Sequence, residues 1–172
     1  MTAEELLARG KDFRFELVRG EPVPSPVRGW VHSRTLTNLF HLLYSFVDEC
    51  RLGFVGIQVG CVLARSPDTV LGADVCFITR GREVGPGYLE GPPDLAIEVL
   101  SPDDRASETQ KKIREYLAAG TRQVWVVDPD TRTIAVYYPS GEARIYSGQQ
   151  DVTGGDILPG FSFQPERLFN LE

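Results

Sequence analysis

Residues 92–102 read PPDLAIEVLSP, and this stretch decides the fold. Leu95 to Leu100 form an apolar run that is interrupted only by Glu98 and is bounded on both sides by prolines. A short apolar run between turn residues is typical of a central strand that is buried on both faces. Since a carboxylate is costly to bury unless it is paired or binds a metal, Glu98 marks this strand as a candidate site.

The segments after this strand predict a strand–helix–strand unit. Residues 107–119 place Ile113 and Tyr116 on one side of a helix, with Gly120 as its C-cap, and residues 124–128 form a second apolar strand. Strands joined through a helix pair in parallel, with a right-handed connection.

Regular spacing predicts the remaining elements. Residues 32–50 carry apolar side chains three and four apart, which indicates a long helix with one buried face. Thr2 and Glu5 form a capping box that opens a short helix ending at Gly10. Strands are expected over 54–64 and 70–79, with a loop over 80–93.

Hairpins are expected near both ends of the chain. Residues 13–23 alternate around a turn at Arg19–Gly20, with prolines that stop the pairing, and residues 133–138 pair with 143–146. The fold class is therefore α/β: a mixed β-sheet core flanked by helices, with added N- and C-terminal β-hairpins. The length of 172 residues suits a single domain over 1–172.

Composition narrows the functional classes. The formal net charge of −6 counts against a large basic face for nonspecific DNA binding. The chain has three cysteines, an odd number, and they are widely spaced: Cys50, Cys61 and Cys76. We therefore expect buried free thiols rather than disulfides or a zinc site. An acidic start and the lack of a long apolar run predict a cytoplasmic protein with no membrane partner.

Three carboxylates on two strands are candidates for a metal site. Asp94 lies four residues before Glu98 and should face the same side of its strand, and Asp74 lies among apolar residues in the strand over 70–79. Mg²⁺ or Mn²⁺ could bind here, because Mg²⁺ takes one or two carboxylates together with waters and phosphate oxygens. The alternative is that Glu98 pairs with an arginine or caps a backbone group, and that Asp74 lies in a turn.

Lys112 is the candidate cation. It stacks with Glu108 and Tyr116 at a spacing of four residues, which could place its ammonium over the carboxylates and stabilise charge on a phosphate. The alternative is an exposed lysine paired with Glu108. Tyr116 and Trp125 fit the core better than ligand stacking.

Two residues earlier in the chain complete the set. Glu16 is flanked by apolar residues, and in a hairpin with a solvent face this is ordinary. His32 precedes the long helix and could contact phosphate or cap the helix. Glycine-rich nucleotide motifs, a phosphate-binding loop and a G-x-S-x-G nucleophile elbow are absent from the sequence, which excludes those chemistries.

Residues 92–102 resemble the signature of the Uma-type restriction endonuclease family, which belongs to the PD-(D/E)XK nuclease superfamily. The resemblance continues at Lys112 and Tyr116, at residues 118–120, and at residues 124–129, VWVVDP. Upstream, residues 15–21 and His32 also fit, as do residues 158–161, LPGF. The similarity spans nearly the whole chain.

The resemblance implies a restriction-endonuclease-like core in which acids from two adjacent strands bind Mg²⁺. Asp74 corresponds to the first acid and Glu98 to the second, with Glu16 as an auxiliary acid near the metal. The lysine of the usual E-x-K motif would fall at Leu100, which cannot replace it, and the family places that lysine on the helix, at Lys112 here. Ala73 stands where the superfamily has a proline.

The leading hypothesis is a metal-dependent endonuclease that acts on DNA, with Asp74, Glu98, Lys112 and Glu16 as its site and a homodimer as the expected assembly. The acidic charge and Leu100 support a second hypothesis, a catalytically silent module for binding or assembly. A third is a hydrolase of smaller phosphodiesters.

Overall fold

The computed structural model describes residues 1–9, 15–25 and 27–170. The helices are α1 (Ala3–Ala8), α2 (Trp30–Cys50), α3 (Ala106–Ala119) and α4 (Glu166–Phe169). The strands are β1 (Phe15–Val18), β2 (Glu21–Pro24), β3 (Gly53–Ala64), β4 (Thr69–Thr79), β5 (Leu89–Glu90), β6 (Leu95–Val99), β7 (Gln123–Asp128), β8 (Thr133–Tyr137), β9 (Ala143–Ser147), β10 (Val152–Thr153) and β11 (Ser162–Phe163).

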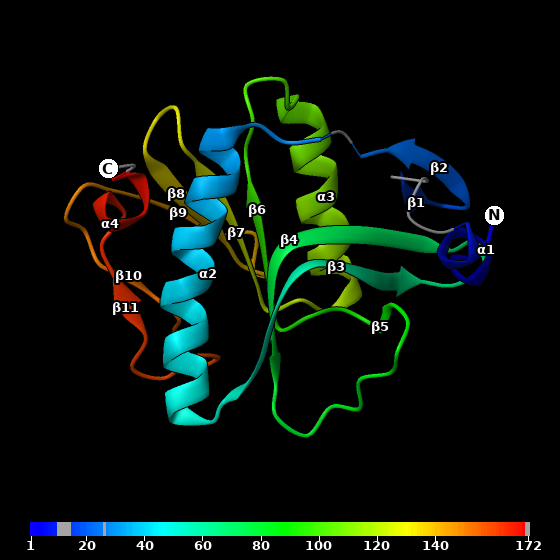
Figure 1. Ribbon diagram of the computed structural model, residues 1–172, viewed down its shortest axis with the longest axis horizontal. Coiled ribbons are helices and arrows are strands. Elements are labelled where there is room, and N and C mark those ends of the chain that lie inside the picture. Colours follow the sequence, from blue (N-terminus) through cyan, green and yellow to red (C-terminus); the bar gives the residue numbers. More distant parts are fainter. Residues whose placement is uncertain (10–14, 26, 171–172) are drawn as a thin grey trace.

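Within the described residues, one mixed sheet of nine strands organises the protein (Figure 1). Its main path runs β2-β1-β4-β6-β7-β8-β9, with β3 paired to β4 and β5 paired to β3. β6 and β7 are parallel and connected through α3, while β4 runs antiparallel to β6. The predicted α/β class is confirmed, and the two predicted hairpins, β1–β2 and β8–β9, form the two ends of this path.

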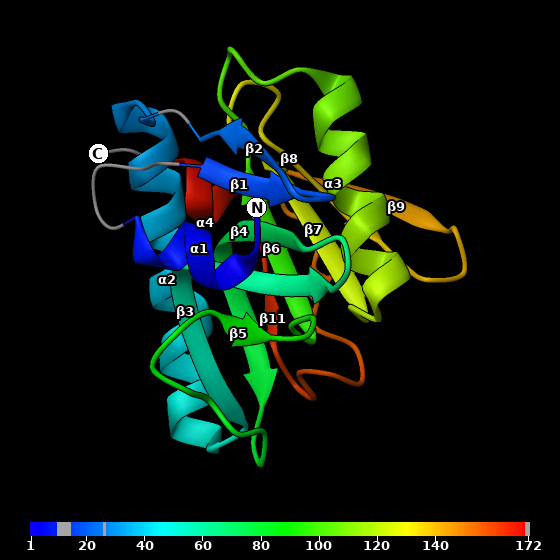
Figure 2. The same ribbon diagram turned by 90° about the vertical axis from the view of Figure 1, so that its right-hand side faces the viewer.

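The central strands are buried because helices cover both faces of the sheet (Figures 1 and 2). Leu39 and Leu43 of α2 belong to the same apolar cluster as Ile97 of β6. Ile113 of α3 belongs to the cluster that contains Ala96. All five residues of β6 are buried, as the apolar run predicted. Alternate β6 side chains therefore face opposite helices, and Glu98 shares its side with Ala96.

Helix ends follow the predicted chemistry in part. The capping box of Thr2 and Glu5 is present, and the C-cap of α3 is Gly120, whose φ of 113° favours glycine. The predicted end of α1 at Gly10 lies outside the described residues. α2 starts two residues earlier than predicted, at Trp30. Its N-cap is Gly29, which is extended and has no side chain to signal the helix start in the sequence.

Some predicted details are wrong. The prolines after the turn at Arg19–Gly20 were expected to stop the hairpin, but the first of them, Pro22, lies inside β2. An edge strand tolerates proline because one side of its backbone forms no ladder. Cys50 was expected to be buried but is exposed at the end of α2. The segments β5 and α4 were not predicted, since a few residues give no periodic signal. None of the helices in the described part of the chain is long and apolar enough to cross a membrane.

Candidate active site

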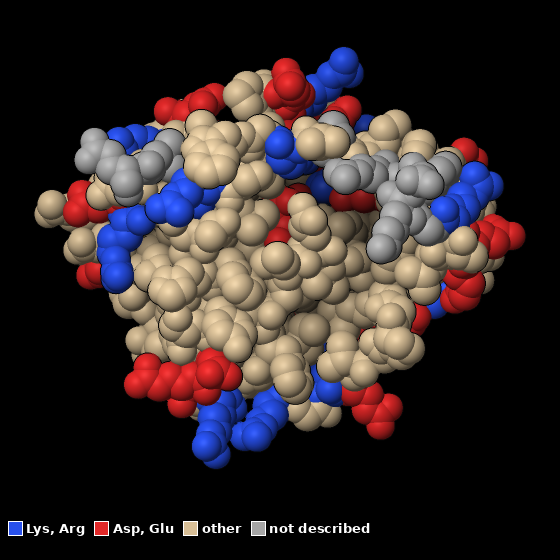
Figure 3. Space-filling view, viewed as in Figure 1, with Lys and Arg blue, Asp and Glu red and all other residues tan. Residues whose placement is uncertain are grey.

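A cavity of about 300 Å³ lies beside the ends of β4 and β6. Its lining includes three carboxylates, two cations and a glycine: Glu16, Asp74, Glu98, Arg28, Lys112 and Gly72. In the space-filling view, acidic side chains are recessed beside basic ones in a hollow below the segment that enters α2 (Figure 3). Three of the four acids that the sequence predicted, Glu16, Asp74 and Glu98, thus meet Lys112 at one place.

Glu98 is held at both carboxylate oxygens. Its side chain turns toward α3, where the Tyr116 hydroxyl donates to Oε1 at 3.2 Å and the Lys112 ammonium donates to Oε2 at 3.2 Å. Glu98 is 5% exposed, and Tyr116 is fully buried. Tyr116 therefore belongs to the core, as its apolar ring suggested, while its hydroxyl orients the carboxylate.

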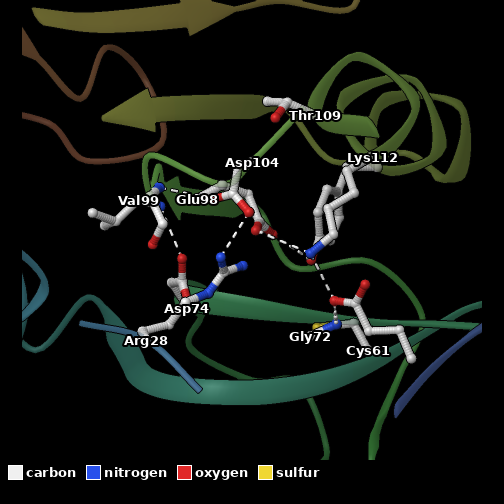
Figure 4. Close-up of polar contacts among 12 residues, drawn as sticks. Arg28, Cys61, Gly72, Asp74, Glu98, Val99, Asp104, Thr109 and Lys112 are labelled. Atoms are coloured by element: carbon white, nitrogen blue, oxygen red, sulfur yellow. Dashed lines mark hydrogen bonds and ion pairs between the residues drawn. The ribbon is translucent and has the colours of Figure 1, made fainter. Parts of the chain in front are cut away.

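Lys112 connects two parts of the chain that are distant in sequence. Its Nζ donates to Glu16 Oε1 at 2.7 Å as well as to Glu98 (Figure 4). The same Glu16 oxygen accepts a hydrogen bond from the Gly72 amide at 3.0 Å. The predicted alternative, a pair between Lys112 and Glu108, is wrong, because Lys112 is directed at the cavity and Glu108 is exposed.

Asp74 lies where β4 separates from β6. The β4–β6 ladder ends at the pair Val75 and Ile97, and two residues further along β6 the Val99 amide donates to Asp74 Oδ2 at 2.8 Å. The buried His32 Nε2 is 3.2 Å from the same oxygen. Asp74 is thus not a turn residue, and His32 orients it rather than capping α2.

Burial and charge perturb the ionisation of this cluster. Burial raises the pKa of Glu98 to about 8; Lys112 opposes the rise, and the negative charges of Asp74 and Glu16 add to it. The pKa of Lys112 is raised: burial lowers it, but Glu98 and Glu16 outweigh burial. The pKa of Tyr116 is raised well above its ordinary value, mainly by burial and then by Glu98. The site thus holds a fixed ammonium and a carboxyl group that is easily protonated.

The donors suit a hard divalent cation. Asp74 and Glu98 supply carboxylate oxygens from adjacent strands to one cavity. Burial is the main cause of the raised pKa of Glu98 and the charge of Asp74 adds to it, so a bound cation would favour the ionised form. Mg²⁺ needs only one or two carboxylates when waters and phosphate oxygens complete its shell. Among the described residues, no three His, Cys, Asp or Glu side chains group closely enough to hold a metal by themselves.

Asp94 does not join this site, which corrects the prediction from strand alternation. Its Oδ2 accepts a hydrogen bond from the Thr79 amide at 2.8 Å, at the opposite end of β6 from Glu98. Four residues of extended chain separate the two acids by about 13 Å. Strand periodicity gives the side of a sheet but not proximity along the strand.

Sequence reasoning missed Arg28 and Asp104. Arg28 lines the cavity, and its Nη1 donates to Asp104 Oδ1 at 2.7 Å. Arg28 lies in a segment with no periodic pattern, and its partner is 76 residues away. No local signal in the sequence could have paired them.

The sheet and this site define a restriction-endonuclease-like α/β fold. The crystal structure of a putative nuclease from Anabaena variabilis is similar over 98% of this chain and 97% of that chain, with a TM-score of 0.84 and 23% sequence identity. Residues 3–168 match the Uma2 family, described as "Putative restriction endonuclease", and the chain belongs to that family. A search of the curated proteins found no match.

Proposed function

We propose that this protein is a metal-dependent endonuclease that hydrolyses DNA phosphodiester bonds. The observation that carries the proposal is Lys112, whose ammonium bridges Glu16 and Glu98 in the cavity that Asp74 also lines. Membership of a family described as restriction endonucleases supports it. DNA is the substrate, and Mg²⁺ or Mn²⁺ is the cofactor that Asp74 and Glu98 would hold.

A bound Mg²⁺ would supply Lewis acidity toward the phosphate and a water nucleophile at neutral pH. Hydrolysis forms one bond from the water oxygen to phosphorus, breaks the bond from phosphorus to the leaving oxygen, and transfers a proton to that leaving oxygen. The side chains of the site would hold the reacting groups in place and stabilise the negative charge that grows on the phosphate.

Lys112 keeps its proton, since its pKa is raised, and its Nζ can donate to a phosphate oxygen as negative charge grows there. Glu16 fixes the ammonium from the other side, and the Gly72 amide fixes Glu16. The Tyr116 hydroxyl orients Glu98, and the Val99 amide and His32 orient Asp74. Each group that would touch the substrate or the metal therefore has a fixed partner.

The test is cleavage of supercoiled plasmid by the purified chain with Mg²⁺ or Mn²⁺, with EDTA as a blank. We expect Glu98→Gln and Lys112→Met to lower the rate by about 10²-fold or more, because each removes charge from the site. The controls Glu108→Gln and Lys111→Met change exposed side chains on the same helix and should stay within about twofold of wild type.

Equal nicking by the wild type and the site variants would contradict the proposal, because it would identify a contaminating nuclease. Calorimetric titration with Mn²⁺ separates the alternatives. A folded wild type that neither binds Mn²⁺ nor cuts DNA would be a binding or assembly module. Cleavage of a small phosphodiester but not of plasmid would indicate a hydrolase with a smaller substrate. Light scattering tests the homodimer, which stays a prediction.

A further inference from the structure

Arg28 stands at the cavity without a role in the site described above. It lies between β2 and α2, its side chain is 19% exposed, and its guanidinium extends toward Asp74 and Asp104 (Figure 4). Only the bond from Nη1 to Asp104 is found for this guanidinium within the described part of the chain. A guanidinium has five N–H donors, so most of them remain available to a ligand.

Asp104 fixes the guanidinium from one side. Its Oδ1 accepts from Arg28, and its Oδ2 accepts from the Ser101 amide at 2.8 Å, so the carboxylate is held by the loop between β6 and α3. The ion pair therefore joins the segment before α2 to the segment before α3. A guanidinium that already donates one bond to a fixed carboxylate has fewer rotamers to lose when it binds a ligand.

A phosphate in this cavity would lie near three carboxylates, so a second cation beside Lys112 would favour its binding. Lys112 is already bonded to two carboxylates, at 2.7 and 3.2 Å, whereas Arg28 is bonded to one. Burial lowers the pKa of Arg28, but Asp104, with smaller contributions from Asp74 and Glu98, raises it overall. The side chain is thus a permanent cation close to the two acids proposed to bind metal.

We infer that Arg28 binds a backbone phosphate of the DNA at the cavity, with Asp104 as the residue that positions it. This inference rests on the proposed function. The planar fork of a guanidinium matches two phosphate oxygens, which an ammonium cannot do. Arg28 would hold the phosphate on the side of the cavity away from Lys112 and bring the bond to be cut between the two cations.

The test is DNA affinity, measured by fluorescence anisotropy with a duplex oligonucleotide and Ca²⁺ at several salt concentrations. A gel run after each titration checks that the oligonucleotide has not been cut. We expect Arg28→Gln to weaken binding by about three- to tenfold and to lower the slope of log K against log salt by about one. Arg28→Lys should weaken binding less than Arg28→Gln but cut plasmid more slowly than wild type, because it keeps the charge and loses the fork. Asp104→Asn should weaken binding less than Arg28→Gln and leave the salt slope nearly unchanged.

Arg144→Gln is the matched control, since it removes one exposed arginine on the edge strand β9. It should leave affinity and salt slope as in the wild type. The inference is overturned if Arg28→Gln binds with the affinity and salt slope of a wild type that binds DNA, or binds more tightly. A wild type that neither binds nor cuts DNA contradicts the proposed function itself. The behaviour of the wild type therefore distinguishes failure of the proposed function from failure of the inference about Arg28.

Discussion

Lys112 and Arg65 each bond carboxylates that include residues distant in sequence, but the two cations lie in different surroundings. The Lys112 side chain is 23% exposed, and the side chains alone of its partners Glu16 and Glu98 are 11% and 7% exposed. The Arg65 side chain is 41% exposed, and it bonds three carboxylates, of which two are about 70% exposed: Glu4, Asp68 and Glu90. The pairing is alike, and the burial differs.

The difference in burial shows which of the two clusters is the better candidate for a functional role. Water and salt screen the charges around Arg65, so that network adds little to stability. The charges around Lys112 have lost much of their water, and such a cluster costs about as much in desolvation as it returns in attraction. Folding therefore gives little reason to bury Lys112 of α3 against Glu98 of β6, and this supports the proposed catalytic role of the pair. The predictions below test this contrast in order of expected effect.

The largest effect is expected from Lys112→Met at pH 8. The change leaves Glu16 and Glu98 near each other without their cation, and breaking a buried pair from one side costs about 3–5 kcal/mol. The loss should be smaller at pH 6, where Glu98 takes up a proton. Urea unfolding at both pH values measures it, with Lys111→Met as the exposed neighbour that should change little. Equal losses for the two variants would show that burial does not separate them.

The second effect is the dependence of stability on pH without metal. The pKa of Glu98 rises from an ordinary 4.5 to about 8 on folding, so between these values the folded state holds a proton that the unfolded chain releases. The contribution of Glu98 to the free energy of unfolding is fully present below pH 4.5 and is lost as the pH rises through 8. The free energy of unfolding falls over this range by at most about 1.4 kcal/mol per pH unit. The raised pKa of Lys112 adds no slope in this range, because its contribution lasts until more alkaline pH.

Urea unfolding in EDTA from pH 5 to pH 8 checks this sign. The free energy of unfolding of the wild type should fall with rising pH, and Glu98→Gln should flatten the curve because it removes the titrating group. A wild-type curve that rises over this range, or one that Glu98→Gln leaves unchanged, would place the origin of the slope elsewhere.

A smaller effect is expected from Tyr116→Phe. The change removes the hydroxyl that donates to Glu98 at 3.2 Å in a fully buried position, and losing one such bond costs about 1–2 kcal/mol. The variant should also raise the pKa of Glu98 further, since one donor to the charged form is gone. Thermal unfolding measures the loss, and Tyr137→Phe, whose hydroxyl accepts an exposed bond from Gln110, is the control. A greater loss in the control would contradict the role of burial.

Most of the fold could be predicted because its elements carry strong local signals. The β6 run, the apolar face of α2 and the glycine cap of α3 each follow from spacing or turn chemistry over a few residues. Beyond the β6–β7 crossover and the hairpins β1–β2 and β8–β9, the sheet order could not be read from the sequence. The pairing of β1 with β4 sets Leu17 opposite Val70, and no local sequence signal indicates such a pairing.

The residues of the candidate site could be predicted where a charged side chain stands among apolar neighbours in the sequence. Glu98 and Asp74 could be found because they are acids among apolar residues, and Lys112 through its place on the helix that follows. Asp94 was placed wrongly because the period of a strand gives direction without distance. Arg28 lies in an irregular segment and meets its partner only through tertiary structure.

The smallest effect is expected from Arg65→Ala. Its bonds to Glu4 and Glu90 lie at the surface, and Asp68 keeps its bonds from the backbone amides of Ala3 and Ser66 without the arginine. The midpoint of thermal unfolding should therefore change by about 2 °C or less, and less still at high salt, because exposed pairs are screened. Plasmid cleavage should match the wild type. If Arg65→Ala destabilised the protein as much as Lys112→Met does, exposure would not be what distinguishes the two clusters, and the functional reading of the buried one would lose its physical basis.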